Sequence, residues 1–123
     1  MANILIVDDE TSVNTLLGNA LEKEGHTIFS ADNGVKGLSI YNSNNIDLVI
    51  TDLVMPEKGG IEMIMDLKKQ KPDIKIIAIS GGGGITGRFD YLPIAQLVGA
   101  SHVISKPFEL SDIRSQVAQL LAS

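Results

Sequence analysis

Short runs of apolar residues recur along the chain, separated by longer stretches in which apolar residues follow a helical spacing. The runs at residues 4–7, 48–50 and 76–79 are continuously apolar, which is typical of central strands in a parallel sheet covered on both faces. Weaker runs at residues 27–29 and 103–104 indicate edge strands. The pattern therefore predicts five strands.

The stretches around these strands are predicted to be helices, because their apolar residues recur at intervals of three and four. Gly25 is placed to end the first helix as the residue just beyond its C-terminus. Asp90 is a candidate N-cap for the fourth, with Pro93 in its first turn. The five apolar stripes are Val13, Leu16, Leu17, Ala20 and Leu21; Val35 and Leu38; Ile61, Ile64 and Met65; Tyr91, Ile94, Leu97 and Val98; and Leu110, Ile113, Val117, Leu120 and Leu121.

Strands that alternate with helices predict an α/β fold in which a parallel sheet is covered by helices on both faces. Five such units in 123 residues favour a single-domain (βα)₅ flavodoxin-like sandwich with strand order 2-1-3-4-5. One domain is expected over residues 1–123, since the length suits a single core. Ligands of such sheets bind at the carboxyl ends of the strands, between the first and third.

Composition narrows the class of protein. The chain is 44% hydrophobic and 20% charged, as in ordinary globular domains, and has no cysteine, which excludes disulfides and thiolate metal sites. Its formal charge of -5 argues against a nucleic-acid-binding domain. Residues 1–10 lack the basic start of a secretory signal, and no apolar stretch has membrane-spanning length. We expect a soluble cytoplasmic protein with neither nucleic-acid nor membrane partners.

Chemically active residues follow the predicted strands: Asp8 and Asp9 the first, Asp52 the third, Ser80 the fourth and Lys106 the fifth. Parallel strands bring these ends to one edge of the sheet. Two carboxylates about 4 Å apart repel by roughly 4 kcal/mol at an effective dielectric of 20, and one lysine cannot balance three of them. Oxygen ligands around a partly hydrated position suit Mg²⁺, which also accepts phosphate oxygens.

A metal beside an aspartate, a hydroxyl and a lysine is suited to phosphoryl chemistry. Asp52 is the candidate nucleophile, since carboxylates form acyl phosphates. Mg²⁺ and Lys106 would neutralise the charge of the transferring group, while the Ser80 hydroxyl would hydrogen-bond one of its oxygens.

The chain resembles response-regulator receiver domains of two-component signalling over essentially its whole length. Four motifs carry this resemblance, in order and each at a predicted strand end. They are Ile4-Leu5-Ile6-Val7-Asp8-Asp9-Glu10, then Asp52-Leu53-Val54-Met55-Pro56 with Gly60, then Ser80-Gly81, and finally Gly99-Ala100 leading to Lys106-Pro107-Phe108.

The resemblance implies a role for each matching residue. Asp52 would be the phosphoacceptor, receiving a phosphoryl group from a phosphohistidine of a histidine kinase or phosphotransfer protein. Asp9 would bind Mg²⁺ directly, Asp8 largely through water, and Asp52 and the Val54 carbonyl would complete the protein ligands. Ser80 would be the switch hydroxyl, Lys106 would contact the phosphoryl group, and the bond before Pro107 would be cis.

Two features depart from the family pattern. Val103 stands three residues before the lysine, where the family usually has an aromatic that turns inward on phosphorylation. The segment from Ser80 to Lys106 is longer than usual, and we hypothesise that its glycine-rich part, residues 81–88, closes over phosphorylated Asp52. A downstream protein target is expected on the surface of the fourth helix, fifth strand and fifth helix, where candidates are Tyr91, Ile94, Gln96, Arg114 and Gln119.

Alternative functions are less compatible with the residues. An aspartyl-nucleophile phosphatase needs a second acid two residues after the nucleophile, where this chain has Val54. A flavin carrier of the same fold would have its phosphate repelled by Asp8, Asp9 and Glu10. The glycines at residues 81–84 lack the sequence of a nucleotide-binding loop. Whether the domain stands alone or belongs to a longer protein is left open.

Overall fold

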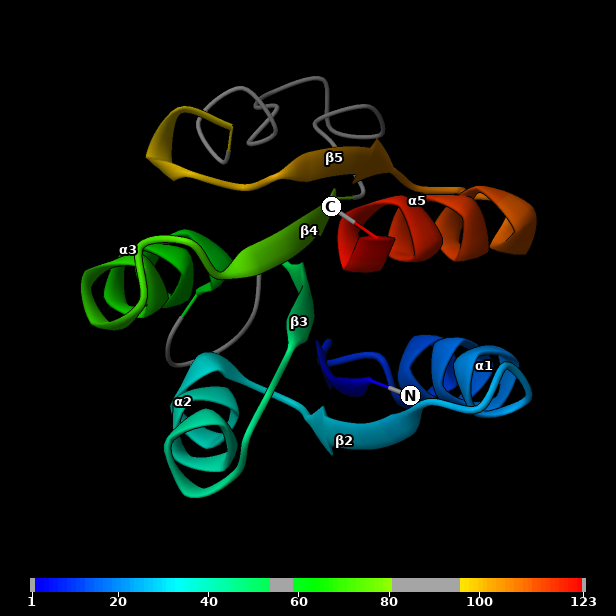
Figure 1. The fold of residues 1–123 in the computed structure, drawn as a ribbon, viewed down its shortest axis with the longest axis horizontal. Coiled ribbons are helices and arrows are strands. Elements are labelled where there is room, and N and C mark those ends of the chain that lie inside the picture. The colour runs from blue at the N-terminus through cyan, green and yellow to red at the C-terminus, as the bar shows by residue number, and fades with distance from the viewer. Residues whose placement is uncertain (1, 54–58, 81–95, 123) are drawn as a thin grey trace.

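The computed structural model describes residues 2–53, 59–80 and 96–122. Strands and helices alternate along the chain, and the five predicted strands are all present (Figure 1). Their bounds are β1 (Asn3–Val7), α1 (Thr11–Glu22), β2 (Thr27–Ala31), α2 (Gly34–Ser43), β3 (Leu48–Asp52), α3 (Gly60–Gln70), β4 (Lys75–Ser80), β5 (His102–Ser105) and α5 (Leu110–Ala122).

The strands form one parallel sheet in the order β2-β1-β3-β4-β5, which confirms the predicted flavodoxin-like topology. The weak apolar runs are the edge strands, as expected. In the register of the central strands, Val7 pairs with Thr51 and Asp52 with Ile79. The carboxyl ends of β1, β3 and β4 are therefore level with one another.

Helices cover both faces of the sheet, α1 and α5 on one side and α2 and α3 on the other (Figure 1). Alternate residues of the central strands point to the two faces, so that Ile4 and Ile6 pack with α1 and α5 while Leu5 and Val7 pack with α2 and α3. All four side chains are fully buried. This double covering explains why the central strands are continuously apolar.

The last turn of α1 is closed by Gly25, which lies beyond Glu22 as predicted and has a positive φ of 95°. The amide of His26 donates to the Leu21 carbonyl, and that of Gly25 to the Glu22 carbonyl. These two bonds form a Schellman motif, which satisfies carbonyls at the end of the helix.

Some predicted core positions are exposed instead. Leu16 is 49% exposed, since Leu17, Gly18, Ala20 and Leu21 form the buried face of α1, with Gly18 close to Ile28. Met65 is 47% exposed, since Met63, Ile64 and Leu67 form the buried face of α3. Val35 and Leu97 are also exposed. The helices α1, α2, α3 and α5 were predicted correctly, but three- and four-residue spacing left the direction of their buried faces uncertain by about one residue, or 100°.

Parts of the prediction lie outside the described residues. These are most of the fourth helix, including Asp90, Tyr91, Pro93 and Ile94, together with Val54 and the hypothesised loop at residues 81–88. Residues 96–98 are helical. Within the described segments, none of the helices combines the length and apolar character required to cross a bilayer.

Candidate phosphoryl-transfer site

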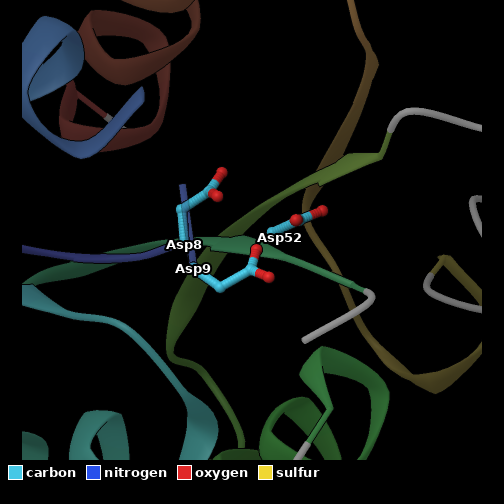
Figure 2. Close-up of side chains that lie close together, drawn as sticks. All are labelled: Asp8, Asp9 and Asp52. Carbon is cyan, nitrogen blue, oxygen red and sulfur yellow. The ribbon is translucent and has the colours of Figure 1, made fainter. Parts of the chain in front are cut away.

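Three aspartates gather at the carboxyl ends of β1 and β3, which are neighbouring strands (Figure 2). Asp8 and Asp9 follow β1 directly, and Asp52 is the last residue of β3. One carboxylate oxygen from each lies within 4.8 Å of the other two. Asp8 and Asp52 are buried, with 2% and 7% of their surface exposed, whereas Asp9 is open to solvent. The predicted convergence of the three acids is confirmed.

Lys106, just beyond β5, extends into the same group. Its Nζ lies 3.3 Å from an Asp8 oxygen and 3.5 Å from an Asp52 oxygen. Its side chain is 18% exposed. The Lys106–Pro107 peptide bond is cis, as predicted. Lys106 thus neutralises part of the charge on the two buried acids.

Burial and like charge shift the protonation of this group. Removal from water raises the pKa of Asp52 to about 6, and the neighbouring charge of Asp8 adds to this against the opposing effect of Lys106. Burial likewise raises the pKa of Asp8, although its hydrogen bond from Glu10 and the charge of Lys106 oppose the rise. Burial alone would lower the pKa of Lys106, but Asp52 and Asp8 outweigh it and raise that pKa. The negative charge of the carboxylates therefore exceeds the positive charge that Lys106 supplies.

Local hydrogen bonds fix the carboxylates. Asp8 Oδ1 accepts from the Glu10 amide at 2.8 Å, and Asp52 Oδ1 accepts from the Leu53 amide at 2.8 Å. The side-chain amide of Asn14 in α1 donates to the Asp8 carbonyl at 2.7 Å and to the Ala31 carbonyl at 3.2 Å. Asn14 thus ties the ends of β1 and β2 to the first helix.

Gly60, the first residue of α3, lies directly against the Asp52 backbone. Its amide donates to the Leu53 carbonyl at 3.0 Å. A Cβ at this position would lie 2.2 Å from the Asp52 carbonyl oxygen and 2.8 Å from the Leu53 Cα. The close approach of α3 to the end of β3 therefore requires glycine.

The other residues predicted for the site are placed less fully. Ser80 ends β4 and pairs with Ser105 of β5, so its backbone lies one strand away from Asp52, but its side chain is outside the described part of the structure. The Val54 carbonyl also lies outside it. Val103 is half-buried and packs against the core on the α2 and α3 side.

Two residues without a predicted site role also contact these groups. Glu10 places a carboxylate oxygen 3.1 Å from Lys106 Nζ, and Asn14 holds the backbone of Asp8. The position of Glu10 directly after two site aspartates was a usable signal. No comparable signal marked Asn14, because a polar residue on an amphipathic helix normally faces the solvent.

The donor set fits a hard divalent cation such as Mg²⁺. The carboxylate oxygens converge, two of their three carboxyl groups have raised pKa values, and only Lys106 supplies a positive partner among the described residues near them. Oxygen ligands with one solvent-exposed side match the preference of Mg²⁺ for carboxylates and retained water.

A cavity of about 900 Å³ opens far from this site, at the amino-terminal ends of the strands. Residues such as His26, Asp47 and Lys75 line it. Within the described residues, the three aspartates are the only acidic or histidine cluster that could hold a metal. The residues that could bind a metal therefore lie at the opposite, carboxyl-terminal edge of the sheet.

The raised pKa of Asp52 predicts that the metal-free protein loses stability as pH rises. Between the unfolded value of 3.8 and the folded value of about 6, the folded state holds a proton that the unfolded state releases. Stability from this group is therefore greatest below pH 3.8, is lost as pH rises through about 6, and is lower by up to about 3 kcal/mol at pH 7.

Asp52→Asn removes this titration while its amide oxygen can still accept from Leu53. We expect urea unfolding in EDTA to show the variant more stable than wild type by about 1–3 kcal/mol at pH 7, and by much less at pH 4.5. An advantage of equal size at both pH values would contradict the assigned cause.

The fold and the acidic site together define a receiver domain of two-component response regulators, a phosphoacceptor signalling module. The family model of the response regulator receiver domain matches residues 4–118, and the chain belongs to this family. The resemblance inferred from the four motifs is thereby confirmed. Nothing in the comparisons supports the phosphatase alternative.

Individual relatives agree with this assignment. Sporulation initiation phosphotransferase F of Bacillus subtilis is 33% identical, with 96% of this chain matching 92% of that protein. The DNA-binding transcriptional regulator NtrC of Azospirillum brasilense is 32% identical over 99% of this chain, which spans only 24% of the regulator. The solved response regulator TrrA of Thermotoga maritima, in complex with Mg²⁺ and BeF, has a TM-score of 0.83 and 32% identity, covering 98% of this chain and 99% of TrrA.

Proposed function

We propose that Asp52 accepts a phosphoryl group from a phosphohistidine of a histidine kinase or phosphotransfer protein. The observation that carries this proposal is the position of Asp52: a nearly buried carboxylate at the end of a central strand, beside two further aspartates and Lys106. With a pKa of about 6, most Asp52 side chains are ionised at neutral pH and able to act as nucleophiles.

In the transfer, an Asp52 carboxylate oxygen attacks the phosphorus of the donor. An oxygen–phosphorus bond forms as the phosphorus–nitrogen bond breaks, and the imidazole keeps the electron pair of that bond and takes up a proton if the medium supplies one. Lys106, already within 3.5 Å of Asp52, is placed to stabilise negative charge on the incoming group. The product is an acyl phosphate on Asp52.

Asp9 and Asp52 would hold Mg²⁺ directly, with Asp8 acting largely through water and the Val54 carbonyl completing the set. Mg²⁺, when bound, supplies the positive charge that the acidic group lacks and polarises phosphoryl oxygens. Support for this assignment comes from the three converging carboxylates and from TrrA, which is similar to this chain and was solved with Mg²⁺ and BeF.

The signal would pass from the site through Ser80 and the neighbouring strand β5. The backbone of Ser80 pairs with β5, and Val103 on that strand packs into the core. Val103 cannot act as a rotating aromatic, so we propose that a shift of the Ser80 backbone passes the change to β5 through its pairing with Ser105. A downstream protein target would detect that change at the surface of α5 and β5, where Arg114 and Gln119 are candidates.

Incubation with acetyl phosphate and Mg²⁺, followed by intact mass spectrometry, tests this function. Wild type should gain the mass of one phosphoryl group, and Asp52→Asn should gain none. Asp73→Asn, at an exposed aspartate elsewhere, is the control and should behave as wild type. No gain in wild type, or an equal gain in Asp52→Asn, would refute the proposal. Small phosphomonoesters should not be turned over, as expected of a signalling domain.

A further inference from the structure

Glu10 makes the shortest ion pair of Lys106 among the described residues. Its Oε1 lies 3.1 Å from Lys106 Nζ, closer than Asp8 at 3.3 Å and Asp52 at 3.5 Å. The Glu10 side chain is 58% exposed, whereas the Asp8 and Asp52 side chains are only 3% and 8% exposed. Lys106 is thus held between two buried carboxylates and one on the solvent side.

Three carboxylates thus lie within ion-pair distance of an ammonium group that has three N–H donors, and Glu10 accepts a hydrogen bond from it at 3.1 Å. A phosphoryl group on Asp52 adds oxygens that compete for the same donors. One existing partner of Lys106 must then give way. Asp8 is buried and fixed by the Glu10 amide, whereas the exposed Glu10 carboxylate can return to water at little cost.

We propose that Glu10 is a positioning residue that holds Lys106 in the unphosphorylated protein and is displaced from it by the phosphoryl group. This proposal rests on the function proposed for Asp52. The Glu10 backbone is fixed, because its amide donates to Asp8 and its carbonyl accepts from Val13 and Asn14 at the start of α1. The side chain can therefore release Lys106 without any movement of the backbone.

Removing the Glu10 charge should make Lys106 more available to a phosphoryl-shaped anion. We expect Glu10→Gln to bind fluoroberyllate two- to fivefold more tightly than wild type at saturating Mg²⁺, since exposed ion pairs contribute energies of this size. Affinity for Mg²⁺ alone, measured separately, should stay the same or decrease. Glu22→Gln makes the same charge change at the far end of α1 and should leave fluoroberyllate affinity unchanged.

A double-mutant cycle with Lys106→Gln, followed by calorimetry, separates action through Lys106 from a general charge effect. In the Lys106→Gln background, the Glu10 substitution should no longer increase fluoroberyllate affinity; an undiminished increase would overturn the proposal. A crystal structure of the wild-type complex provides a second measurement, in which the Glu10–Lys106 separation should exceed the ion-pair limit of about 4 Å. A retained contact would overturn the proposal.

Failure of this proposal differs from failure of the proposed function. If wild type binds fluoroberyllate and Glu10→Gln binds it no more tightly, only the role of Glu10 is refuted. If wild type does not bind fluoroberyllate in the presence of Mg²⁺, the function of Asp52 is refuted and the role of Glu10 with it.

Discussion

Gly60→Ala is expected to destabilise the protein by about 2–3 kcal/mol, as other substitutions that force extra atoms into a packed interior do. The added methyl carbon would lie 2.2 Å from the Asp52 carbonyl oxygen, and its next neighbours are also backbone atoms. No side-chain rotation relieves such a clash. Either α3 or the end of β3 must move, and the second movement displaces Asp52, the proposed phosphoacceptor. Urea unfolding measures the loss of stability, and phosphorylation by acetyl phosphate should be reduced in the same variant.

Gly59→Ala is the matched control, one residue earlier at the N-cap of α3. Its φ of -74° suits any residue, and among the described residues an added Cβ would meet only the Leu53 carbonyl oxygen, at 3.4 Å. The weaker capping by alanine and the lower entropy of its unfolded chain nearly offset each other, so a change below about 1 kcal/mol is expected. Equal losses in the two variants would show that the close approach at Gly60 is not the cause.

Lys106→Met is expected to cost about 1–3 kcal/mol of stability in the metal-free protein at pH 7, because buried carboxylates are left without their cation. The folded pKa values of Asp8 and Asp52, already raised, should rise further without Lys106. Carboxyl groups with raised folded pKa values bind protons more readily when folded, so acid should relieve the loss. Urea unfolding in EDTA should therefore show the difference from wild type shrinking between pH 7 and pH 4.

Lys36→Met provides the control for loss of an ion pair. Lys36 Nζ lies 3.1 Å from Asp32, but the two side chains are 63% and 59% exposed, so less than about 0.5 kcal/mol should be lost. A loss at Lys106 no larger than that at Lys36, or one that persists unchanged at pH 4, would mean that Lys106 does not compensate buried charge.

The strand order could be predicted from the sequence because it depends on features that are local and strong. Continuously apolar runs indicate strands buried on both faces, and right-handed crossovers then leave few topologies for five units. The buried faces of the helices were harder to predict. In α1, Gly18 is buried close to Ile28 while Leu16 is exposed, and this arrangement depends on the spatial position of β2 rather than on the sequence of the helix.

In the candidate site, the positions set by the backbone could be predicted, whereas the contacts set by side-chain rotamers could not. Asp8, Asp9, Asp52 and Lys106 were predicted to meet because each follows a parallel strand, and the backbone alone brings them together. The Glu10–Lys106 contact depends on the rotamers of two long side chains, and the Asn14 hydrogen bonds depend on where α1 crosses the ends of two strands. The sequence places Glu10 next to the site aspartates but does not fix the rotamer that reaches Lys106, and no pattern marks the Asn14 hydrogen bonds.

Lys106 joins the two ends of the chain, since it pairs with Glu10 across a separation of 96 residues. Contacts this distant in sequence require the loop-closure entropy to be overcome before they form, so the complete charge cluster is assembled only after β5 has joined the sheet. A chain still emerging from the ribosome contains Asp8, Asp9 and Asp52 well before Lys106 is synthesised. If Asp52 accepts the phosphoryl group as proposed, a chain whose fifth strand is not yet in place would lack the Lys106 charge at that site.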